Sequence, residues 1–266
     1  MRLREHNAKP RPTFHGKDDY YLGIELEVEA PDYDRRAKGL AISKAPRYCY
    51  AKEDSSLNCY GWELVTHPIA RSTWLSAKAK ASPVTRLFDL VSGLVSLGYT
   101  SHDGDRCGLH VHVSRSAFRG GLRTSHFYWF QKLVNGNLFF KLSQRSSGNL
   151  TFCQRRTMKP AEVRVGPRNA SRYYAVNPTS QTVEVRLFRG NMREDRVRKA
   201  VESVVAAVEF SRTLTSRDWA SDLDGDFCRW VSERKATYPN LYAYLRERGV
   251  LTNSEDHSVE EVSACA

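Results

Sequence analysis

The chain has 266 residues, of which 41% are hydrophobic, so it is long enough to bury the core of one large domain or two small ones. Its formal net charge of +11 suits nucleic acid, an anionic membrane or a phosphate-rich ligand, and charge alone does not choose among them. The apolar runs fall far short of the roughly 20 residues that a bilayer crossing needs, and no secretory signal is visible after the basic opening residues. The six cysteines form no CxxC pair, so we expect reduced thiols in a cytoplasmic protein.

The first third of the chain predicts three strands. Residues 20–30 alternate apolar and polar side chains, which is typical of a half-buried strand. A connection over 31–46 leads to a short aromatic strand around 47–53 and a third strand over 60–68. Because strand side chains alternate between faces, the carboxylates gather opposite the apolar residues. These segments carry Glu25, Glu27, Asp54 and Glu63.

The middle third predicts two amphipathic helices around a histidine-bearing strand. Apolar side chains recur at helical spacing over residues 83–98, and again in one helix from about Ser125 to residue 142. Between them, CGLHVHV places His110 and His112 on the face opposite its leucine and valines. A half-buried strand with solvated histidines explains this stretch equally well, so its role depends on the rest of the chain.

The last third predicts a loop, a hairpin and three helices. The Arg-, Gly- and Ser-rich residues 145–171 favour a mobile or ligand-facing loop. A hairpin follows over 172–190, in which strict alternation places Glu184, Arg186 and Phe188 opposite Val183, Val185 and Leu187. A long helix from about Glu194 to Leu214 carries an inner valine stripe, and two short helices complete the C-terminal part.

Four polar strand faces in one chain favour a shared site, although each face alone is more often solvated. If the strands share one sheet, the carboxylates and at least one imidazole come together. Carboxylates that close repel, so cations must lie between them or their pKa values must rise. Oxygen ligands with one nitrogen suit Mg²⁺ or Mn²⁺ better than zinc. Arginine forks match the phosphates that accompany Mg²⁺, and the second half of the chain supplies Arg155, Arg156, Arg164, Arg168, Arg172, Arg186 and Arg189.

In this order, the segments GIELEVE, KEDSS…GWELVTHP, CGLHVHV and RYYAVN…TVEVRLFRG resemble the amidoligase family of the carboxylate–amine ligase superfamily, which includes glutamine synthetase and glutamate–cysteine ligase. The resemblance covers roughly residues 20–215, and the helical end fits stand-alone members found in phages and bacteria. It implies an α+β fold with a curved, largely antiparallel sheet that binds ATP and metal on its concave face and packs helices on its convex face. It also implies that a substrate carboxylate takes the γ-phosphoryl group of ATP and that an amine then displaces phosphate from the acyl phosphate.

The resemblance further implies residue roles and cofactors. Glu27, Asp54 and Glu63 match one metal site, and Glu25, His110 and Glu184 match a second, so two or more Mg²⁺ or Mn²⁺ ions are expected. ATP is expected to contact His112, Arg172, Arg186 and Arg189. Asp54, Glu63 and Arg186 are expected to be catalytic. Asp54 is shorter than the glutamate of glutamine synthetases, and deprotonation of the incoming amine is a second role open to it.

The expected organisation has four parts. A basic flexible lead covers 1–18, the amidoligase catalytic domain covers 19–215, a helical extension packed on it covers 216–252, and an acidic flexible tail covers 253–266. The substrates are small-molecule or protein-linked carboxylates and amines, and the location is cytoplasmic, in the host if the chain is phage-encoded. The sequence does not identify the acid or the amine.

Two other functions stay open. A nucleic-acid-binding protein explains the positive charge but leaves the acidic strand faces unexplained, so nucleic acid is the less favoured partner. A metal-dependent hydrolase could use the HVH strand as ligands, although such sites usually need more histidines. We expect no membrane partner.

Overall fold

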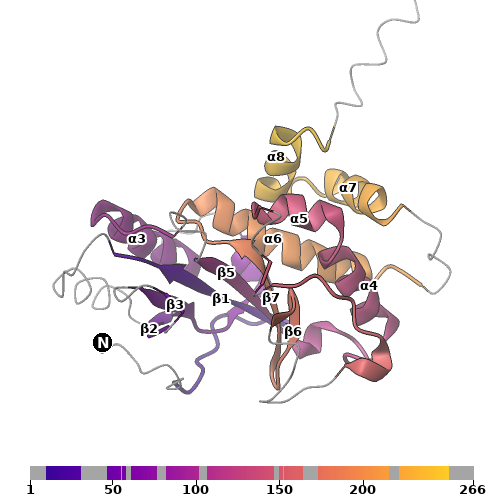
Figure 1. The fold of residues 1–266 in the computed structure, drawn as a ribbon, viewed down its shortest axis with the longest axis horizontal. Helices are drawn as coiled ribbons and strands as arrows, with labels where there is room; N and C mark the ends of the chain where they lie inside the picture. The colour runs from indigo at the N-terminus through magenta and orange to yellow at the C-terminus, as the bar shows by residue number, and fades with distance from the viewer. Residues whose placement is uncertain are drawn as a thin grey trace, which may run out of the picture.

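One open sheet of seven strands, covered by helices on one face, forms the body of the structure (Figure 1). The computed structural model describes residues 10–30, 47–54, 56–57, 61–76, 82–101, 107–146, 150–151, 153–163, 173–215 and 222–251. The strand order is β2-β3-β1-β5-β7-β6, with β4 also paired to β1, and every pairing between named strands is antiparallel. The predicted mixture of helices with a largely antiparallel sheet is therefore confirmed.

The strands lie where alternation predicted them, with one short addition. Their bounds are β1 (Tyr21–Val28), β2 (Cys49–Lys52), β3 (Trp62–Thr66), β4 (Ile69–Ala70), β5 (Gly108–Ser114), β6 (Val176–Pro178) and β7 (Thr182–Arg189). The two-residue strand β4 directly after Pro68 was not predicted, because so short a segment carries no periodicity.

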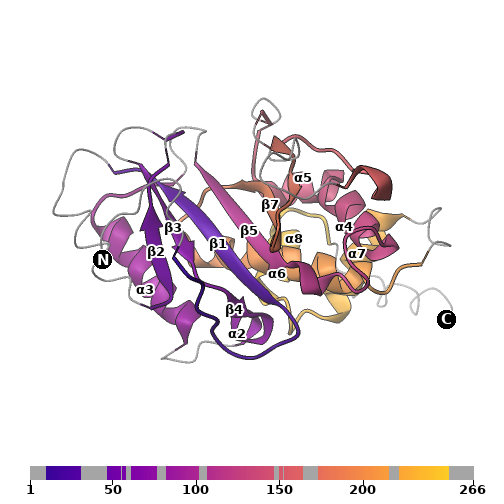
Figure 2. The same cartoon turned by 90° about the horizontal axis from the view of Figure 1, so that it is seen from below.

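The helices cover the apolar face of the sheet. They are α2 (Arg71–Leu75), α3 (Pro83–Ser96), α4 (Ser125–Val134), α5 (Asn137–Ser143), α6 (Glu194–Ser211), α7 (Leu223–Glu233) and α8 (Pro239–Glu247). Figure 2, a view from below relative to Figure 1, shows β2, β3, β1 and β5 in front of α3 and α6. The apolar strand side chains and the inner faces of these helices form one buried cluster. No helix within the described ranges is long and apolar enough to cross a bilayer.

Local signals explain where α3 begins and ends. Ser82 accepts a hydrogen bond from the backbone of Thr85 at 3.1 Å, and Pro83 occupies the first helical position, where its missing N–H costs nothing. Gly98 follows the helix with φ of +81°, a conformation that a side chain would strain.

The single helix expected from Ser125 to residue 142 is two helices. Gly136 is extended, with φ of −73° and ψ of 171°, and separates α4 from α5. A Cβ at Gly136 would lie 3.0 Å from the carbonyl oxygen of Leu133, so this close turn suits glycine. The break lets α4 pack on α6 while α5 packs on β7, which one straight helix could not do.

The strict alternation expected along β7 is wrong beyond Arg186. Val185 pairs with Val111, but Phe188 pairs with Leu109, so β7 has one extra residue between these two positions. Such a bulge reverses the face of the residues that follow it. Phe188 therefore joins the helix side, where its ring centroid lies 5.4 Å from Nζ of a lysine on α6.

The C-terminal helices pack on α6. The valine stripe of α6 is fully buried, and α6 contacts both α7 and α8. Glu202 on α6 accepts hydrogen bonds from Asn240 Nδ2 and from the backbone N–H of Leu241, and so caps the start of α8. The segments 1–9, 31–46, 164–172 and 252–266 lie outside the described residues, so they include part of the expected lead, the expected acidic tail and Arg172.

Candidate metal centre

The register of the sheet places the predicted side chains in rows on the face opposite the helices. Glu63 on β3 pairs with Glu27 on β1, and Glu25 on β1 pairs with His110 on β5. His112 pairs with Glu184 on β7 in the next row. Directly paired residues point to the same side of a sheet. We call this side, with Glu25, Glu27, Glu63, His110, His112 and Glu184, the acidic face.

Two groups of three side chains on the acidic face could each hold a metal ion. The first triad is Glu25, His110 and Glu184, and the second triad is Glu27, Asp54 and Glu63. Within each triad, one ligand atom per residue lies within 4.8 Å of the others. All of these side chains except Asp54 are buried, and Asp54 is half-buried. The structure thus brings together all six residues expected to bind metal, grouped as the resemblance implied.

His110 lies between the two triads. Its Nδ1 is 3.5 Å from Oε2 of Glu25 and 3.4 Å from Oε1 of Glu184, while its Nε2 is 3.6 Å from Oε1 of Glu27. Nδ1 makes no hydrogen bond to any residue that the structure describes. A buried nitrogen that faces two carboxylates without bonding to either has the geometry of a metal ligand.

Glu184 is fixed in place by two neighbours. Its Oε1 accepts a hydrogen bond from Nη1 of Arg186 at 2.5 Å, and its Oε2 accepts one from Nδ2 of Asn177 at 2.7 Å. Asn177 lies opposite Glu184 on β6, which explains the contact. Asn177 was not singled out from the sequence, because an asparagine near a turn is ordinary. Partners of this kind orient metal ligands in proteins.

Glu27 is held by the backbone of β5. Its Oε2 accepts a hydrogen bond of 2.5 Å from the N–H of Gly108. A Cβ at Gly108 would lie 3.0 Å from Nε2 of His110, 3.1 Å from Nη2 of Arg145 and 3.4 Å from Oε2 of Glu27. Gly108 therefore leaves the room that these side chains need. The glycine two residues before His110, at the start of β5, was the available sequence signal for this close approach.

Lys52 is the cation of the second triad, and it was not predicted. It pairs with Glu63 across β2 and β3, and its ammonium group forms an ion pair with Oε2 of Glu63. Both side chains are almost fully buried. Burial alone would lower the pKa of Lys52, but Glu25 and Glu63 outweigh burial and raise the pKa above its usual value. Lys52 therefore stays charged.

Asp54 lies in the turn after β2. Its Oδ1 accepts a hydrogen bond of 2.8 Å from the N–H of Ser56, which fixes the side chain close to Glu63. Burial alone would raise the pKa of Asp54, but hydrogen bonds, first among them that from the Ser56 backbone, outweigh it and lower the pKa. A carboxylate that stays ionised is a suitable metal ligand and a weak base.

The two carboxylates of the first triad stay ionised for the same reason. Burial opposes the charge of Glu25, but His112 and His110 outweigh burial and hold its pKa well below its usual range. Burial likewise opposes the charge of Glu184, but Arg186, followed by the two imidazoles, lowers the pKa of this carboxyl.

Glu63 shows the opposite shift. Burial, and then repulsion by Glu25, raise the pKa of Glu63 to about 9, although Lys52 acts in the other direction. The two triads together hold five carboxyl groups against two cationic side chains, Lys52 and Arg186. The donor set of five carboxylates and one imidazole fits hard divalent cations such as Mg²⁺ or Mn²⁺.

The expected nucleotide-binding residues have different positions. His112 lies beside the first triad, with Nε2 3.4 Å from Oε1 of Glu25 and Nδ1 3.1 Å from Oγ1 of Thr182. Arg186 contacts Glu184, as described. Arg172 lies outside the described residues. Arg155 and Arg156 contact Asn137 and Tyr174 respectively, in the α5 and β6 region.

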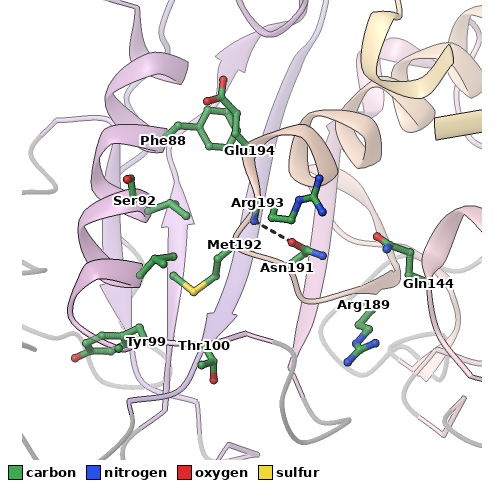
Figure 3. Close-up of a pocket in the computed structure, with 13 residues that line it drawn as sticks. Phe88, Ser92, Tyr99, Thr100, Gln144, Arg189, Asn191, Met192, Arg193 and Glu194 are labelled. Carbon is green, nitrogen blue, oxygen red and sulfur yellow. Dashed lines mark hydrogen bonds between the residues drawn. The ribbon is translucent and has the colours of Figure 1, made fainter. Parts of the chain in front are cut away.

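Arg189 lines a cavity of about 660 Å³ at the end of β7 (Figure 3). The cavity lies between α3 and the loop into α6, and Phe88 and Met192 supply part of its apolar wall. In the same loop, Asn191 Oδ1 accepts a hydrogen bond of 2.9 Å from the N–H of Arg193, ahead of α6 (Figure 3). None of the six triad residues lines this cavity.

Comparison with known proteins adds no family to this geometry. No protein-family model matches the chain, and no curated protein matches it. The residues of the acidic face are therefore the basis for assigning a function to the chain.

Proposed function

We propose that the chain is an ATP-dependent carboxylate–amine ligase with a glutamine-synthetase-like catalytic domain, in keeping with its resemblance to the amidoligases. The observation that carries the proposal is the pair of triads on one sheet face, with His110 between them. A hydrolase with a single metal would not need six ligands, five of them on four strands and Asp54 in a turn. A nucleic-acid-binding protein would not need buried carboxylates on a basic chain.

The residues have distinct roles in the proposed reaction. Mg²⁺ held by the triads would neutralise the phosphates of ATP and the developing charge during transfer. Arg186, which contacts Glu184 and is about one-fifth exposed, would bring a planar guanidinium charge to the phosphoryl oxygens. Glu63 would hold a metal ion of the second triad together with Glu27. Asp54, half-buried beside it, would hold the same ion, and deprotonation of the incoming amine is its second proposed role.

Water would hydrolyse the acyl phosphate, so the site must exclude water. The burial of the acidic face is consistent with this requirement. The triad carboxylates Glu25, Glu27, Glu63 and Glu184 are each at most 8% exposed. A low-dielectric setting strengthens the attraction between metal, phosphate and guanidinium. The proposal places the enzyme in the cytoplasm, where ATP is available, with small-molecule or protein-linked substrates.

The test is ADP release in the presence of Mg²⁺, ATP and a panel of carboxylates, with hydroxylamine as the amine. A ligase of this kind releases ADP only with the right acid and forms a hydroxamate, because hydroxylamine captures the acyl phosphate. The Lys132→Met variant, which changes an exposed lysine on α4, is the control and should retain the activity. Metal-dependent hydrolysis of a substrate in the absence of ATP would contradict the proposal. Salt-sensitive binding of DNA or RNA without any binding of ATP would also contradict it.

A further inference from the structure

The second triad already contains a cation of its own. Nζ of Lys52 contacts Oε2 of Glu63, which is one of the three residues whose oxygens could hold an ion with Glu27 and Asp54. Lys52 is 6% exposed, so its ammonium group lies inside the cluster and not at its rim. An ammonium group is a compact point charge, and it repels a divalent ion at the same carboxylate.

The first triad differs in its nitrogen ligand. Arg186 bonds to Glu184 there, but the guanidinium group is planar and its side chain is 22% exposed, at the edge of the cluster. Nδ1 of His110 still faces Glu25 and Glu184 without a hydrogen bond within the described part of the chain. A cationic side chain only donates hydrogen bonds and has no lone pair for a metal ion. The lone pair of a neutral imidazole can bind a metal ion directly.

We infer that Lys52 is a resident cation of the second triad, so that a divalent ion binds between Glu27, Asp54 and Glu63 only after the ammonium group has left Glu63. The first triad binds its ion without such a step. This inference rests on the metal-binding part of the proposed function. The resemblance implies two or more bound ions, whereas this inference predicts one bound ion when no substrate is present.

Mn²⁺ binding to the purified chain without nucleotide tests the inference. Electron paramagnetic resonance of free Mn²⁺ gives the number of bound ions and their affinity without any measurement of activity. We expect about one tightly bound ion in the wild type and about two in Lys52→Met, with the affinity of the second site raised at least about tenfold. Lys52→Gln is a second neutral variant, and circular dichroism checks that both variants are folded.

Two further variants assign the second ion and control for charge. Lys132→Met also removes a lysine, but an exposed one, and should bind about one ion like the wild type. Glu63→Gln placed in the Lys52→Met chain should return the number to about one, because the second triad loses one of its three carboxyl ligands. A second ion that survives this change lies elsewhere, and the inference is then wrong.

The remaining outcomes separate the inference from the proposed function. Equal numbers of ions in the wild type and Lys52→Met, whether one or two, would overturn the role of Lys52 and leave the metal centre intact. Loss of the wild-type ion in folded Lys52→Met or Lys52→Gln would also overturn it, because Lys52 would then support metal binding. Absence of Mn²⁺ from every variant would overturn both the inference and the metal-dependent ligase.

Discussion

Two regions of the molecule each bury a lysine and a glutamate, but the pKa values of the two lysines shift in opposite directions. On the acidic face, Lys52 and Glu63 contact each other, and the surrounding carboxylates keep Lys52 charged. On α6, Lys199 instead donates to the carbonyl oxygen of Leu142 at 2.5 Å and lies 4.5 Å from the ring centroid of Tyr244. Burial, reinforced by neighbouring arginines, lowers the pKa of Lys199 to about 7.

Glu202 on α6 and Glu63 on the acidic face both have a raised pKa. Glu202 caps α8 through backbone and amide donors, and burial raises its pKa to about 7 despite those bonds. Buried groups on α6 thus tend to lose their charge, whereas Glu25 and Glu184 keep theirs beside imidazole and guanidinium groups. The buried polar groups of the helix layer therefore serve packing between helices. The acidic face instead concentrates negative charge that bound cations can balance.

The largest expected effect comes from a neutral substitution on the acidic face. Glu184→Gln keeps the shape of the side chain but removes a charged ligand of the first triad, so substrate-dependent ADP release should fall below detection. The fold should survive, because the substitution also relieves repulsion among carboxylates. ADP release and the denaturant midpoint are the two measurements, and near-normal turnover would remove Glu184 from the metal centre.

Arg186→Lys should have the next largest effect. A lysine keeps the charge but cannot hold Glu184 and a phosphoryl oxygen at the same time, so turnover should fall about a hundredfold. Steady-state ADP release at saturating ATP measures the loss. Wild-type turnover in this variant would mean that the guanidinium fork has no part in the reaction.

Gly108→Ala tests the crowding around Glu27 and His110 without changing any charge. The added methyl group must displace one of these side chains, so Mn²⁺ affinity should fall by about tenfold. Gly93→Ala on α3 is the matched control, because a Cβ there meets nothing within 4 Å. The control should bind Mn²⁺ like the wild type. Equal affinities in the two variants would mean that Gly108 plays no part in the site.

Lys199→Met should affect stability and leave turnover unchanged. The unfolded chain binds a proton at Lys199 below a pKa of 10.5 but the folded chain only below about 7, so the wild type gains stability as the pH rises through this window. Methionine has no such dependence. The advantage of the variant should therefore shrink between pH 7 and 9.5, on the order of 3 kcal/mol.

Urea unfolding at several pH values measures this change. Lys132→Met serves as the exposed control and should follow the wild type at every pH. A constant difference between Lys199→Met and the wild type across the window would show that Lys199 keeps its charge when buried.

The sequence predicted most elements because their periodicity is local. The alternation in β1 and β5 identified the shared face of Glu25 with Glu27 and of His110 with His112, and the helical spacing identified α3 and α6. The prediction failed where tertiary packing intervened. Gly136 splits the helix between α4 and α5, and the bulge in β7 turns Phe188 toward the helices.

The amino-acid sequence by itself determined which side chains share a face of each strand, since the strand repeat of two residues depends only on backbone geometry. It could not determine that Lys52 meets Glu63 or that Gly108 holds Glu27, because those contacts join strands that are separated along the chain. The tertiary structure, through strand order and register, brings the six residues together in the two triads that the resemblance implied. Packing of the apolar face against the helices fixes that register, and the charged side chains on the other face follow it.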